Sequence, residues 1–276
     1  MTKLSFHLLF CSIFYALVLL LSRPAVSQEV DNESGFNYNE DGNKGPSHWG
    51  ELKQEWHECK TGKMQSPIDL SHQRVQIVHK FVDSKIAYNP TNATLMNRGH
   101  DIMLKWSDDA GYIEINGTRY FLKQCHWHSP SEHTINGEKF ALEAHLVHQS
   151  HNGNIAVIGI LYDIGHSDYF LSTIKEHLEE ISETNEYIEL NDIDPSLVEM
   201  KSSIYYQYYG SLTVPPCTQN VLWIIVKKVR SVASYQLELL RVAVHDDSNT
   251  NARPVQPLNN RIIQLRFRSQ HNEKEH

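Results

Sequence analysis

The segment Gln124-Cys125-His126-Trp127-His128 places two histidines two residues apart in a run that suits a β-strand. Successive side chains of a strand point to opposite faces of its sheet. Gln124, His126 and His128 would therefore share one face, while Cys125 and Trp127 share the other. The spacing predicts a sheet that presents two imidazoles on one side.

A second segment, residues 143–147 (Glu-Ala-His-Leu-Val), repeats this arrangement. Glu143, His145 and Val147 share one face there, so a third imidazole comes from another strand. The two segments flank the turn signal at residues 136–137 (Asn-Gly), and antiparallel strands would bring the histidines together. Three neutral imidazoles without a fourth protein ligand match a catalytic zinc site, which keeps one position open for water or substrate.

The neighbours of these histidines supply partners for a metal site. A zinc-bound histidine usually donates its second ring N–H to an outer acceptor, which fixes its tautomer. Gln124 could serve His126 and Glu143 could serve His145, since each lies two residues earlier on the same face. One His-x-His pair could arise by chance among 17 histidines. A third histidine with its own carboxylate favours the metal site over surface or core histidines.

Residues 1–27 have the pattern of a secretory signal peptide. A basic Lys3 precedes an apolar run that ends at Leu21, and small residues follow at positions 25–27. An uncleaved membrane anchor is the alternative, but the apolar run is short for a bilayer span. Because no later segment is long and apolar enough to span, we expect no stable membrane insertion of the mature chain.

Length and charge narrow the class of protein further. The chain can form one large domain or two small ones, and it shows no internal repeat or convincing linker. Removing residues 1–27 takes away Lys3 and Arg23 but no acidic residue, which changes the formal net charge from −8 to −10. A protein this acidic is not expected to bind nucleic acid. We therefore expect one secreted domain over residues 28–276.

Three cysteines remain after signal removal, and in an oxidising compartment they indicate one disulfide and one free thiol. Cys125 faces away from the histidines of its strand, where it would pack as a small apolar side chain. Cys59 and Cys217 are then the expected pair, and their bond could stabilise the fold by about 2–4 kcal/mol.

Three Asn-x-Ser/Thr triplets agree with secretion. The glycosylation candidates are Asn32, Asn92 and Asn116. Each triplet is short enough to occur by chance, so the three support the signal peptide without establishing it.

Strand signals dominate the chain after an irregular polar stretch over residues 30–63. The predicted strands cover residues 85–88, 102–106, 111–115, 118–128, 140–148, 155–162 and 221–229. Apolar residues at helical spacing predict two helices, over residues 168–181 and 231–241. We therefore expect a mainly β, single-domain fold with peripheral helices and a flexible tail over about residues 262–276.

Seven motifs follow one another between residues 45 and 258. They are Gly45-Pro46-Ser47-His48-Trp49-Gly50, Gln65-Ser66-Pro67-Ile68-Asp69-Leu70, the strand of His126 and His128, Ser131-Glu132-His133-Thr134, residues 143–148, Ser211-Leu212-Thr213-Val214-Pro215-Pro216-Cys217, and Arg253-Pro254-Val255-Gln256-Pro257-Leu258. In this order they resemble the α-class carbonic anhydrases, specifically the secreted plant type. The resemblance implies a large, twisted, mostly antiparallel sheet with zinc at the base of a conical cleft.

The resemblance also implies an activity, the reversible hydration of carbon dioxide to bicarbonate and a proton. His126, His128 and His145 match the ligands of one Zn²⁺ ion, which lowers the pKa of bound water from about 15.7 to about 7. The zinc-bound hydroxide then attacks carbon dioxide. Thr213 resembles the family's gatekeeper, whose hydroxyl accepts from the hydroxide and donates to a carboxylate, here Glu132.

Turnover also requires a group that removes a proton, and a side chain that titrates near neutrality does this best. His100 matches the family's proton shuttle. Tyr38 corresponds to the tyrosine that orders the shuttle's water chain, although two extra residues separate it from Gly45-Pro46.

An apolar wall is expected beside the metal, because carbon dioxide is apolar and makes no strong hydrogen bond. The matching positions are Val147, Val157, Leu212, Val214, Val221 and Trp223. Any one of them could simply be a core residue. That alternative weakens because they fall together on motif positions.

Three cleft positions depart from animal relatives. Arg98, Met103 and Val214 stand where those relatives often have asparagine, a polar amide and threonine. Arg98 adds charge near the expected shuttle and Val214 cannot donate a hydrogen bond, so proton transfer and anion affinity could differ. His133 and His148 match structural histidines of the family and are not expected to bind the metal.

The expected partners are the small molecules carbon dioxide and bicarbonate, with sulfonamides and anions as inhibitors and activated esters as incidental substrates. We expect an extracellular location, with the plastid stroma, reached through the secretory route, as the alternative. A binding or storage module of the same fold is a second hypothesis, but all three ligand histidines, Thr213 and Glu132 are present. A zinc peptidase is a third, and its His-Glu-x-x-His motif is missing from the sequence.

Overall fold

The computed structural model describes residues 35–82, 84–107, 109–184, 187–198, 202–242 and 250–268. The signal peptide expected over residues 1–27 and the triplet at Asn32 lie outside the described residues. Within the described ranges, no helix combines the length and the apolar character that crossing a membrane requires.

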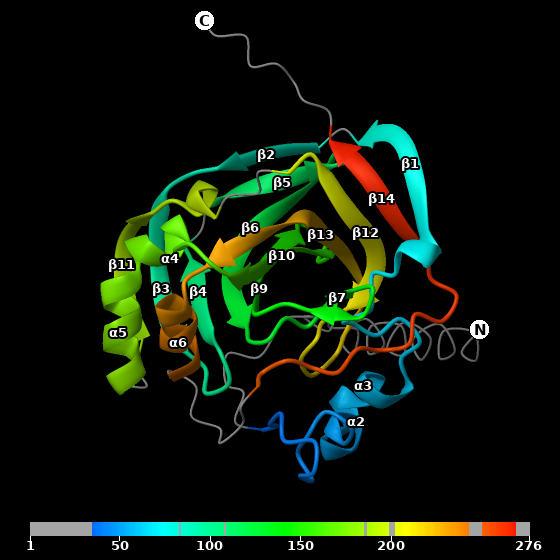
Figure 1. Cartoon of the computed structure of the whole chain (residues 1–276), viewed down its shortest axis with the longest axis horizontal. Coiled ribbons are helices and arrows are strands. Elements are labelled where there is room, and N and C mark those ends of the chain that lie inside the picture. Colours follow the sequence, from blue (N-terminus) through cyan, green and yellow to red (C-terminus); the bar gives the residue numbers. More distant parts are fainter. Residues whose placement is uncertain are drawn as a thin grey trace, which may run out of the picture.

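One mixed sheet of twelve strands dominates the fold (Figure 1). Its strands are β1 (Val75–Val82), β2 (Ser84–Tyr88), β3 (Thr91–Asn97), β4 (Ile102–Trp106), β5 (Gly111–Ile115), β6 (Thr118–His128), β9 (Leu142–Ser150), β10 (Ile155–Ile164), β11 (Tyr187–Ile193), β12 (Ile204–Ser211), β13 (Gln219–Val232) and β14 (Ile263–Arg268). The order along the sheet is β1-β14-β12-β13-β10-β9-β6-β4-β3-β11, and β2 joins through β5, which pairs with β6. Only β1 with β14 and β10 with β13 pair in parallel among the described strands. The expectation of a mostly antiparallel sheet is therefore confirmed.

The two histidine strands lie side by side in the middle of this sheet. β6 and β9 pair antiparallel, with His126 opposite His145 and His128 opposite Glu143. The chain between them forms a small hairpin of β7 (Thr134–Ile135) and β8 (Glu138–Lys139). Asn136 and Gly137 form its turn with φ values of 51° and 80°, a conformation that asparagine and glycine tolerate best.

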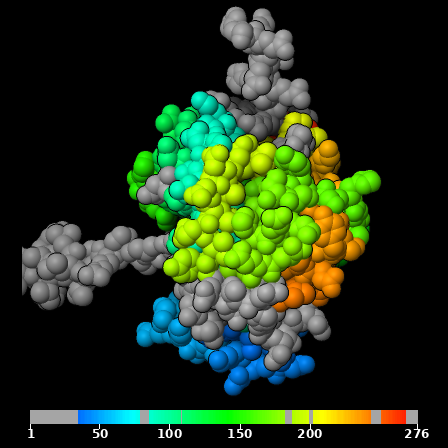
Figure 2. All heavy atoms as spheres, turned by 90° about the vertical axis from the view of Figure 1, so that its left-hand side faces the viewer, coloured from blue at the N-terminus to red at the C-terminus, as the bar shows by residue number. Residues whose placement is uncertain are grey.

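Helices are short and peripheral (Figure 1). They are α2 (Trp49–Leu52), α3 (Glu58–Thr61), α4 (Tyr169–Thr173), α5 (Lys175–Thr184) and α6 (Ser234–Val242), with 3₁₀ turns at Gln54–Trp56, His72–Arg74 and Pro195–Leu197. In the space-filling view, the lime and orange parts of the chain, which carry the helices after residue 168, form much of the face shown (Figure 2). The single helix expected over residues 168–181 is two helices, because the backbone of Ile174 leaves helical geometry at the end of α4. The helix expected from residue 231 begins at Ser234, since β13 continues to Val232.

The flexible tail expected from about residue 262 is wrong for Ile263–Arg268. These residues form β14, which lies between β1 and β12. Ile263 is buried and Leu265 packs against the same apolar cluster, while the polar residues between them alternate to the other face. Because the segment is short and half polar, its alternation of apolar and polar residues gave no clear strand signal. Residues 269–276 lie outside the described residues.

Apolar side chains form two large clusters and one smaller one. The largest contains Cys125 and Trp127, which point away from the histidines as expected. A second contains Val157 and Trp223. A third belongs to the N-terminal segment that carries α2 and α3, drawn in blue in Figure 1, and it includes Cys59.

The expected disulfide is present. Cys59 of α3 and Cys217, in the loop after β12, are bonded with their Cα atoms 5.0 Å apart. Cys125 is free and buried, and burial raises the pKa of its thiol well above the usual value. The bond fixes the N-terminal segment to the loop that follows β12.

Candidate metal centre

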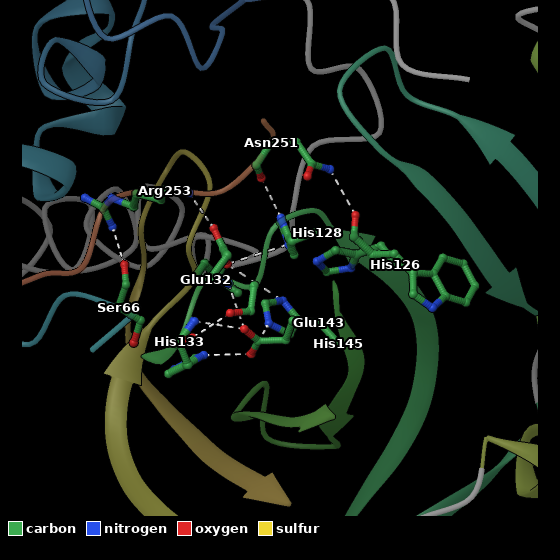
Figure 3. A network of polar contacts seen from close by, with 12 residues as sticks. Ser66, His126, His128, Glu132, His133, Glu143, His145, Asn251 and Arg253 are labelled. Atoms are coloured by element: carbon green, nitrogen blue, oxygen red, sulfur yellow. Dashed lines mark hydrogen bonds and ion pairs between the residues drawn. The ribbon is translucent and has the colours of Figure 1, made fainter. Parts of the chain in front are cut away.

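Three imidazoles meet at the centre of the sheet (Figure 3). His126 and His128 come from β6 and His145 from β9, and their ring centroids lie 4.6–5.1 Å apart. Each is at most 1% exposed. One ring nitrogen from each lies within 4.8 Å of the others, a separation that one metal ion can bridge. The strand pairing therefore brings together the three predicted ligands.

Each imidazole is anchored through its other ring nitrogen. His126 Nδ1–H donates to Gln124 Oε1 at 2.8 Å, and His145 Nε2–H donates to Glu143 Oε1 at 2.8 Å. His128 Nδ1–H donates to the backbone oxygen of Asn251 at 2.7 Å. These bonds leave Nε2 of His126, Nε2 of His128 and Nδ1 of His145 for a metal.

Two observations on these residues fit a cation. His128 Nε2 is buried and has no hydrogen-bond partner, a costly state that a bound ion would relieve. Burial, aided by the neighbouring His128, lowers the pKa of His126 well below its usual value. A low pKa keeps that ring neutral, as a metal ligand must be. For His128, Glu132 and the Asn251 backbone outweigh burial and raise the pKa. Once deprotonated, the three imidazoles around one point form the donor set of a catalytic zinc site.

Glu143 anchors more than its predicted partner. Its Oε2 accepts from the backbone nitrogens of Glu132 at 2.9 Å and His133 at 2.8 Å, while Oε1 accepts from the rings of His133 at 2.7 Å and His145 at 2.8 Å. Burial alone would raise the pKa of Glu143, but His133 and His145 outweigh it and hold the pKa well below the usual value. The carboxylate therefore stays charged and rigid behind His145.

A buried hydrogen-bond chain continues from this carboxylate. Tyr208 donates to His133 Nε2 at 2.7 Å and accepts from Ser66 Oγ at 2.8 Å. Ser66 and Ser211 exchange hydrogen bonds between backbone nitrogen and hydroxyl at 2.9 and 3.0 Å. Because Ser211 precedes the loop that carries Thr213, these hydrogen bonds link His145 to that loop.

Glu132 and Thr213 are both buried, at 0% and 2% exposed. Glu132 Oε1 accepts from the backbone nitrogen of Arg253 at 2.8 Å. Its Oε2 lies 3.7 Å from His128 Nε2 and 3.9 Å from His145 Nδ1 and has no hydrogen-bond partner. The hydrogen bond expected from the Thr213 hydroxyl is therefore not formed, since Oε2 is turned toward the histidine nitrogens.

Arg253, whose backbone nitrogen binds Glu132, is itself held by a buried set of hydrogen bonds. Its side chain is 1% exposed and donates to Gln65 Oε1, to the Ser66 backbone oxygen and to the Cys59 backbone oxygen at 2.8–2.9 Å. Burial lowers the pKa of Arg253 to about 10, so the guanidinium is still charged at neutral pH. It thereby connects the disulfide, the Ser66 segment and the carboxylate.

His100 lies at the edge of the site, against the N-terminal segment. It is 6% exposed, and its Nε2–H donates to the Phe36 backbone oxygen at 2.6 Å. The Tyr38 ring centroid lies 5.7 Å from that of His100, so the structure brings the predicted tyrosine beside the predicted shuttle despite the two extra residues.

Five of the six expected wall residues fall in one apolar cluster. Val157, Leu212, Val221 and Trp223 are at most 1% exposed, and Val147 packs against them. The Trp223 ring lies 4.8 Å from that of His145, which places the cluster beside the imidazoles. Val214 instead packs with the N-terminal aromatic residues, because the chain turns away after Leu212.

The structure also places the remaining residues singled out in the sequence. Met103 is 2% exposed and pairs with His126 across β4 and β6. His148 is buried on the opposite face from the triad, where Tyr88 donates to its Nε2 at 2.7 Å. Asn92 and Asn116 are both exposed.

Asn251 was missed by sequence reasoning. Its backbone oxygen orients His128, and its side chain donates to the backbone oxygens of His100 at 2.8 Å and Trp127 at 2.9 Å. Its position two residues before Arg253 of the last motif was the available signal. Backbone acceptors carry no residue-type signature, so strand periodicity could not identify it.

Comparisons with known proteins agree on a family. Residues 44–267 match the family model described as eukaryotic-type carbonic anhydrase. Alpha carbonic anhydrase 7 of Arabidopsis thaliana is 53% identical over 262 residues, which cover 92% of this chain and 95% of that protein. Alpha carbonic anhydrase 5 of the same plant is 49% identical over 259 residues, covering 93% of each.

Solved structures give the same result. Dioscorin complexed with ascorbate superposes with a TM-score of 0.82 and 39% identity over 85% of this chain and 99% of that one. The α-carbonic anhydrase of Thermovibrio ammonificans, in complex with the inhibitor sulfanilamide, gives 0.73 and 36% over 83% and 98%. Given these matches and the three-histidine centre, the chain belongs to the α carbonic anhydrase family.

Proposed function

We propose that this chain is a zinc hydro-lyase that interconverts carbon dioxide with bicarbonate and a proton. Membership of the α carbonic anhydrase family implies carbon dioxide hydration. The observation that carries the zinc dependence is the arrangement of His126, His128 and His145, each held at one ring nitrogen with the other turned to a common point. This geometry supports a preorganised metal site over a binding module that has lost a ligand histidine.

One Zn²⁺ ion fits the donor set of His126 Nε2, His128 Nε2 and His145 Nδ1. Bound there, zinc would supply the Lewis-acid chemistry that makes water a nucleophile near neutral pH. The chain's own contribution is rigidity, because Gln124, Glu143 and the Asn251 backbone fix the three tautomers.

The other residues prepare the reaction around this point. Glu132 is a buried carboxylate held through Oε1, so its Oε2 can accept a proton donor such as the Thr213 hydroxyl and orient it. The wall of Val147, Leu212 and Trp223 offers an apolar surface to carbon dioxide and excludes water from that side. His100 is the group we assign to carry the released proton to buffer.

Sulfonamides and small anions are the inhibitors we expect, and activated esters are incidental substrates. The relative from Thermovibrio ammonificans was solved with sulfanilamide, which supports this expectation. The apolar wall and the three histidines would be the surfaces that such a ligand contacts. Nucleic acid is not a proposed partner, since the formal net charge is −8.

We place the protein in the secretory pathway, with extracellular delivery favoured over the plastid stroma. The Cys59–Cys217 disulfide supports an oxidising compartment. The exposed side chains of Asn92 and Asn116 are accessible candidates for N-linked glycans.

Stopped-flow carbon dioxide hydration by zinc-quantified mature protein tests the function directly. We expect turnover at one zinc per chain that a sulfonamide inhibits. His145→Ala should abolish it, whereas His166→Ala, which removes an exposed histidine, should change neither zinc content nor rate. Full zinc loading without turnover would contradict the enzyme and favour a binding or storage role.

A further inference from the structure

The proposed shuttle His100 is carried by a tight turn between β3 and β4. The backbone nitrogen of Arg98 donates to the backbone oxygen of Asp101 at 3.0 Å, which closes the turn. Gly99 has a φ of 97°, a left-handed conformation that favours glycine, and its nitrogen donates to Asn97 Oδ1 at 2.9 Å. His100 is therefore the third residue of a turn whose first and last residues are Arg98 and Asp101.

A buried ion pair joins the two ends of this turn. Arg98 Nε donates to Asp101 Oδ1 at 2.7 Å, and a second guanidinium nitrogen contacts Asp101 Oδ2. The side chains are 0% and 2% exposed. Such a fork-to-carboxylate pair is geometrically specific. Because burying two charges costs desolvation energy, a pair of this kind is better explained by the geometry it imposes than by stability.

The turn is also fixed to the metal centre. Asn251 donates from its side chain to the His100 backbone oxygen at 2.8 Å, and its own backbone oxygen accepts from His128 Nδ1 at 2.7 Å. On the other side, the His100 ring donates to the Phe36 backbone oxygen. Displacing the turn would therefore move His100 relative to the three imidazoles.

We propose that Arg98 and Asp101 are positioning residues for proton transfer through His100, and this inference rests on the proposed carbonic anhydrase activity. With Nε2–H bonded to Phe36, Nδ1 is the basic nitrogen of the neutral ring. A water at the metal centre loses a proton, so one of its O–H bonds breaks and an Nδ1–H bond forms. That N–H bond then breaks as the proton passes to a buffer base, which leaves the ring neutral again. The ion pair holds the backbone that sets the path length of this transfer.

The matched test is a double substitution, Arg98→Met with Asp101→Leu, which removes both charges and leaves neither buried alone. The control is Arg119→Met with Glu114→Leu, which removes an exposed arginine–carboxylate pair with a nitrogen–oxygen distance of 3.0 Å. His100→Ala defines the effect of losing the shuttle itself. Zinc content and thermal unfolding show whether each variant is folded and loaded.

Oxygen-18 exchange separates interconversion of carbon dioxide and bicarbonate from proton transfer. We expect the ratio of proton transfer to interconversion to fall about tenfold in the double variant, since a displacement on the order of 1 Å can cost up to ~100-fold. Added imidazole buffer should restore it, and the control pair should leave the ratio unchanged. The positioning role would be overturned if the ratio fell in His100→Ala but stayed unchanged in the double variant.

The other outcomes separate the two proposals. If His100→Ala leaves the ratio unchanged, there is no shuttle to position and the inference fails, while measurable interconversion still supports the proposed function. Absence of interconversion in the wild type would contradict the proposed function itself.

A readout independent of activity comes from ring nitrogen–proton NMR of ¹⁵N-histidine-labelled protein, zinc-free and zinc-loaded. The His100 signal, assigned by its loss in His100→Ala, should be protected from exchange by the Phe36 bond. It should lose that protection in the double variant, while the His128 ring signal remains. Retained protection of His100 would count against the inference.

Discussion

At the scale of single residues, the candidate ligands are oriented by three chemically different acceptors: an amide, a backbone carbonyl and a carboxylate. All three fix a tautomer, but only the carboxylate of Glu143 carries charge. The amide of Gln124 fixes the His126 tautomer without adding charge. Substituting Gln124 therefore tests how much the orientation of the His126 ring alone contributes to zinc binding.

Gln124→Ala should weaken zinc binding by about 10–100-fold, the range typical for losing an outer partner of a histidine ligand. The His126 ring would then be free to rotate and to change tautomer, so binding must first restore its orientation. Competition with a chelator of known affinity measures this. Gln76→Ala, at an exposed glutamine of β1, is the control, and equal affinities for the two variants would contradict the assigned role.

His148 makes a prediction about pH. Burial lowers its pKa to about 4, and the neutral ring is satisfied by Tyr88 at Nε2 and by the Ala156 backbone oxygen at Nδ1. Because the folded-state pKa lies below the usual 6.5, protonation favours unfolding. The stabilisation is complete above about pH 6.5 and is lost as the pH falls toward about 4, amounting to about 3 kcal/mol in all.

Urea unfolding of metal-free protein at pH 7.5 and 4.5 measures this effect. The free energy of unfolding should fall from pH 7.5 to pH 4.5 in both proteins. The fall should be about 2–3 kcal/mol smaller in His148→Gln than in the wild type, because glutamine does not titrate. Chelating zinc in both samples keeps metal loss from contributing. An equal pH dependence in the two proteins would show that His148 is not the titrating group.

The residue-scale predictions from sequence succeeded where the partner's side chain lies on the same strand face as the histidine. Gln124 and Glu143 lie two residues before the histidines they contact, so strand periodicity alone identified them. Asn251 escaped because it acts through a backbone oxygen from an irregular segment. The expected contact between Thr213 and Glu132 depends on side-chain rotamers, which periodicity does not determine.

At the scale of elements, the pairing of β9 with β10 explains why residue 159 is a glycine. Gly159 lies opposite His145 in this pairing, and a Cβ atom built on it would lie 2.6 Å from Ile225 Cδ1 and 3.0 Å from Glu143 Oε1. A strand glycine commonly marks a close approach of this kind. Here the approach leaves space for the carboxylate that anchors the third histidine.

Gly159→Ala should therefore destabilise the fold by about 1–3 kcal/mol, as overpacking does, and should weaken zinc binding by displacing Glu143. Combining it with Ile225→Val shortens the side chain at the closer contact. The combination should recover part of the stability but little of the zinc affinity, because the contact with Glu143 persists. Urea unfolding and chelator competition measure the two effects, and unchanged values for Gly159→Ala would refute the steric argument.

Elements with clear alternation were predicted well from sequence, and β4, β5 and β6 begin and end where expected. The prediction missed β1, β3, β11, β12 and β14 of the large sheet. Two of these, β11 and β14, have a narrow or interrupted apolar face. β11 has a single buried residue among seven, and β14 is half polar. Their strand structure is set by the neighbours they pair with, β3 for β11 and β12 for β14, which no local pattern reveals.

At the scale of the whole molecule, the disulfide joins the N-terminal segment to the site through more than its own bond. The backbone oxygens of its two cysteines accept from Arg253 at 2.9 Å and from Gln65 Nε2 at 3.1 Å. Arg253 in turn holds Glu132 through its backbone nitrogen. The N-terminal segment, the disulfide and the Glu132 carboxylate are therefore linked through one set of hydrogen bonds.

The surface distinguishes the two described glycosylation candidates. Asn116 is exposed in the two-residue turn between β5 and β6, where it and Gly117 have φ values of 51° and 79°. Asn92 lies in β3, its Oδ1 accepts from the Asp192 nitrogen at 3.4 Å, and the Thr94 hydroxyl of its triplet contacts Glu189 of β11. A glycan is accommodated at the tip of a hairpin without loss of such contacts, so modification should favour Asn116.

In protein secreted from plant cells, we expect glycopeptide mass spectrometry to find Asn116 occupied and Asn92 largely unmodified. In an Asn32→Gln background, which removes the third candidate, an amidase that removes N-linked glycans should lower the mass by the same amount that Asn116→Gln lowers it. Asn92→Gln is the matched control and should leave the mass difference intact. Occupancy of Asn92 above that of Asn116 would mean that the pairing of β3 with β11 does not restrain the site.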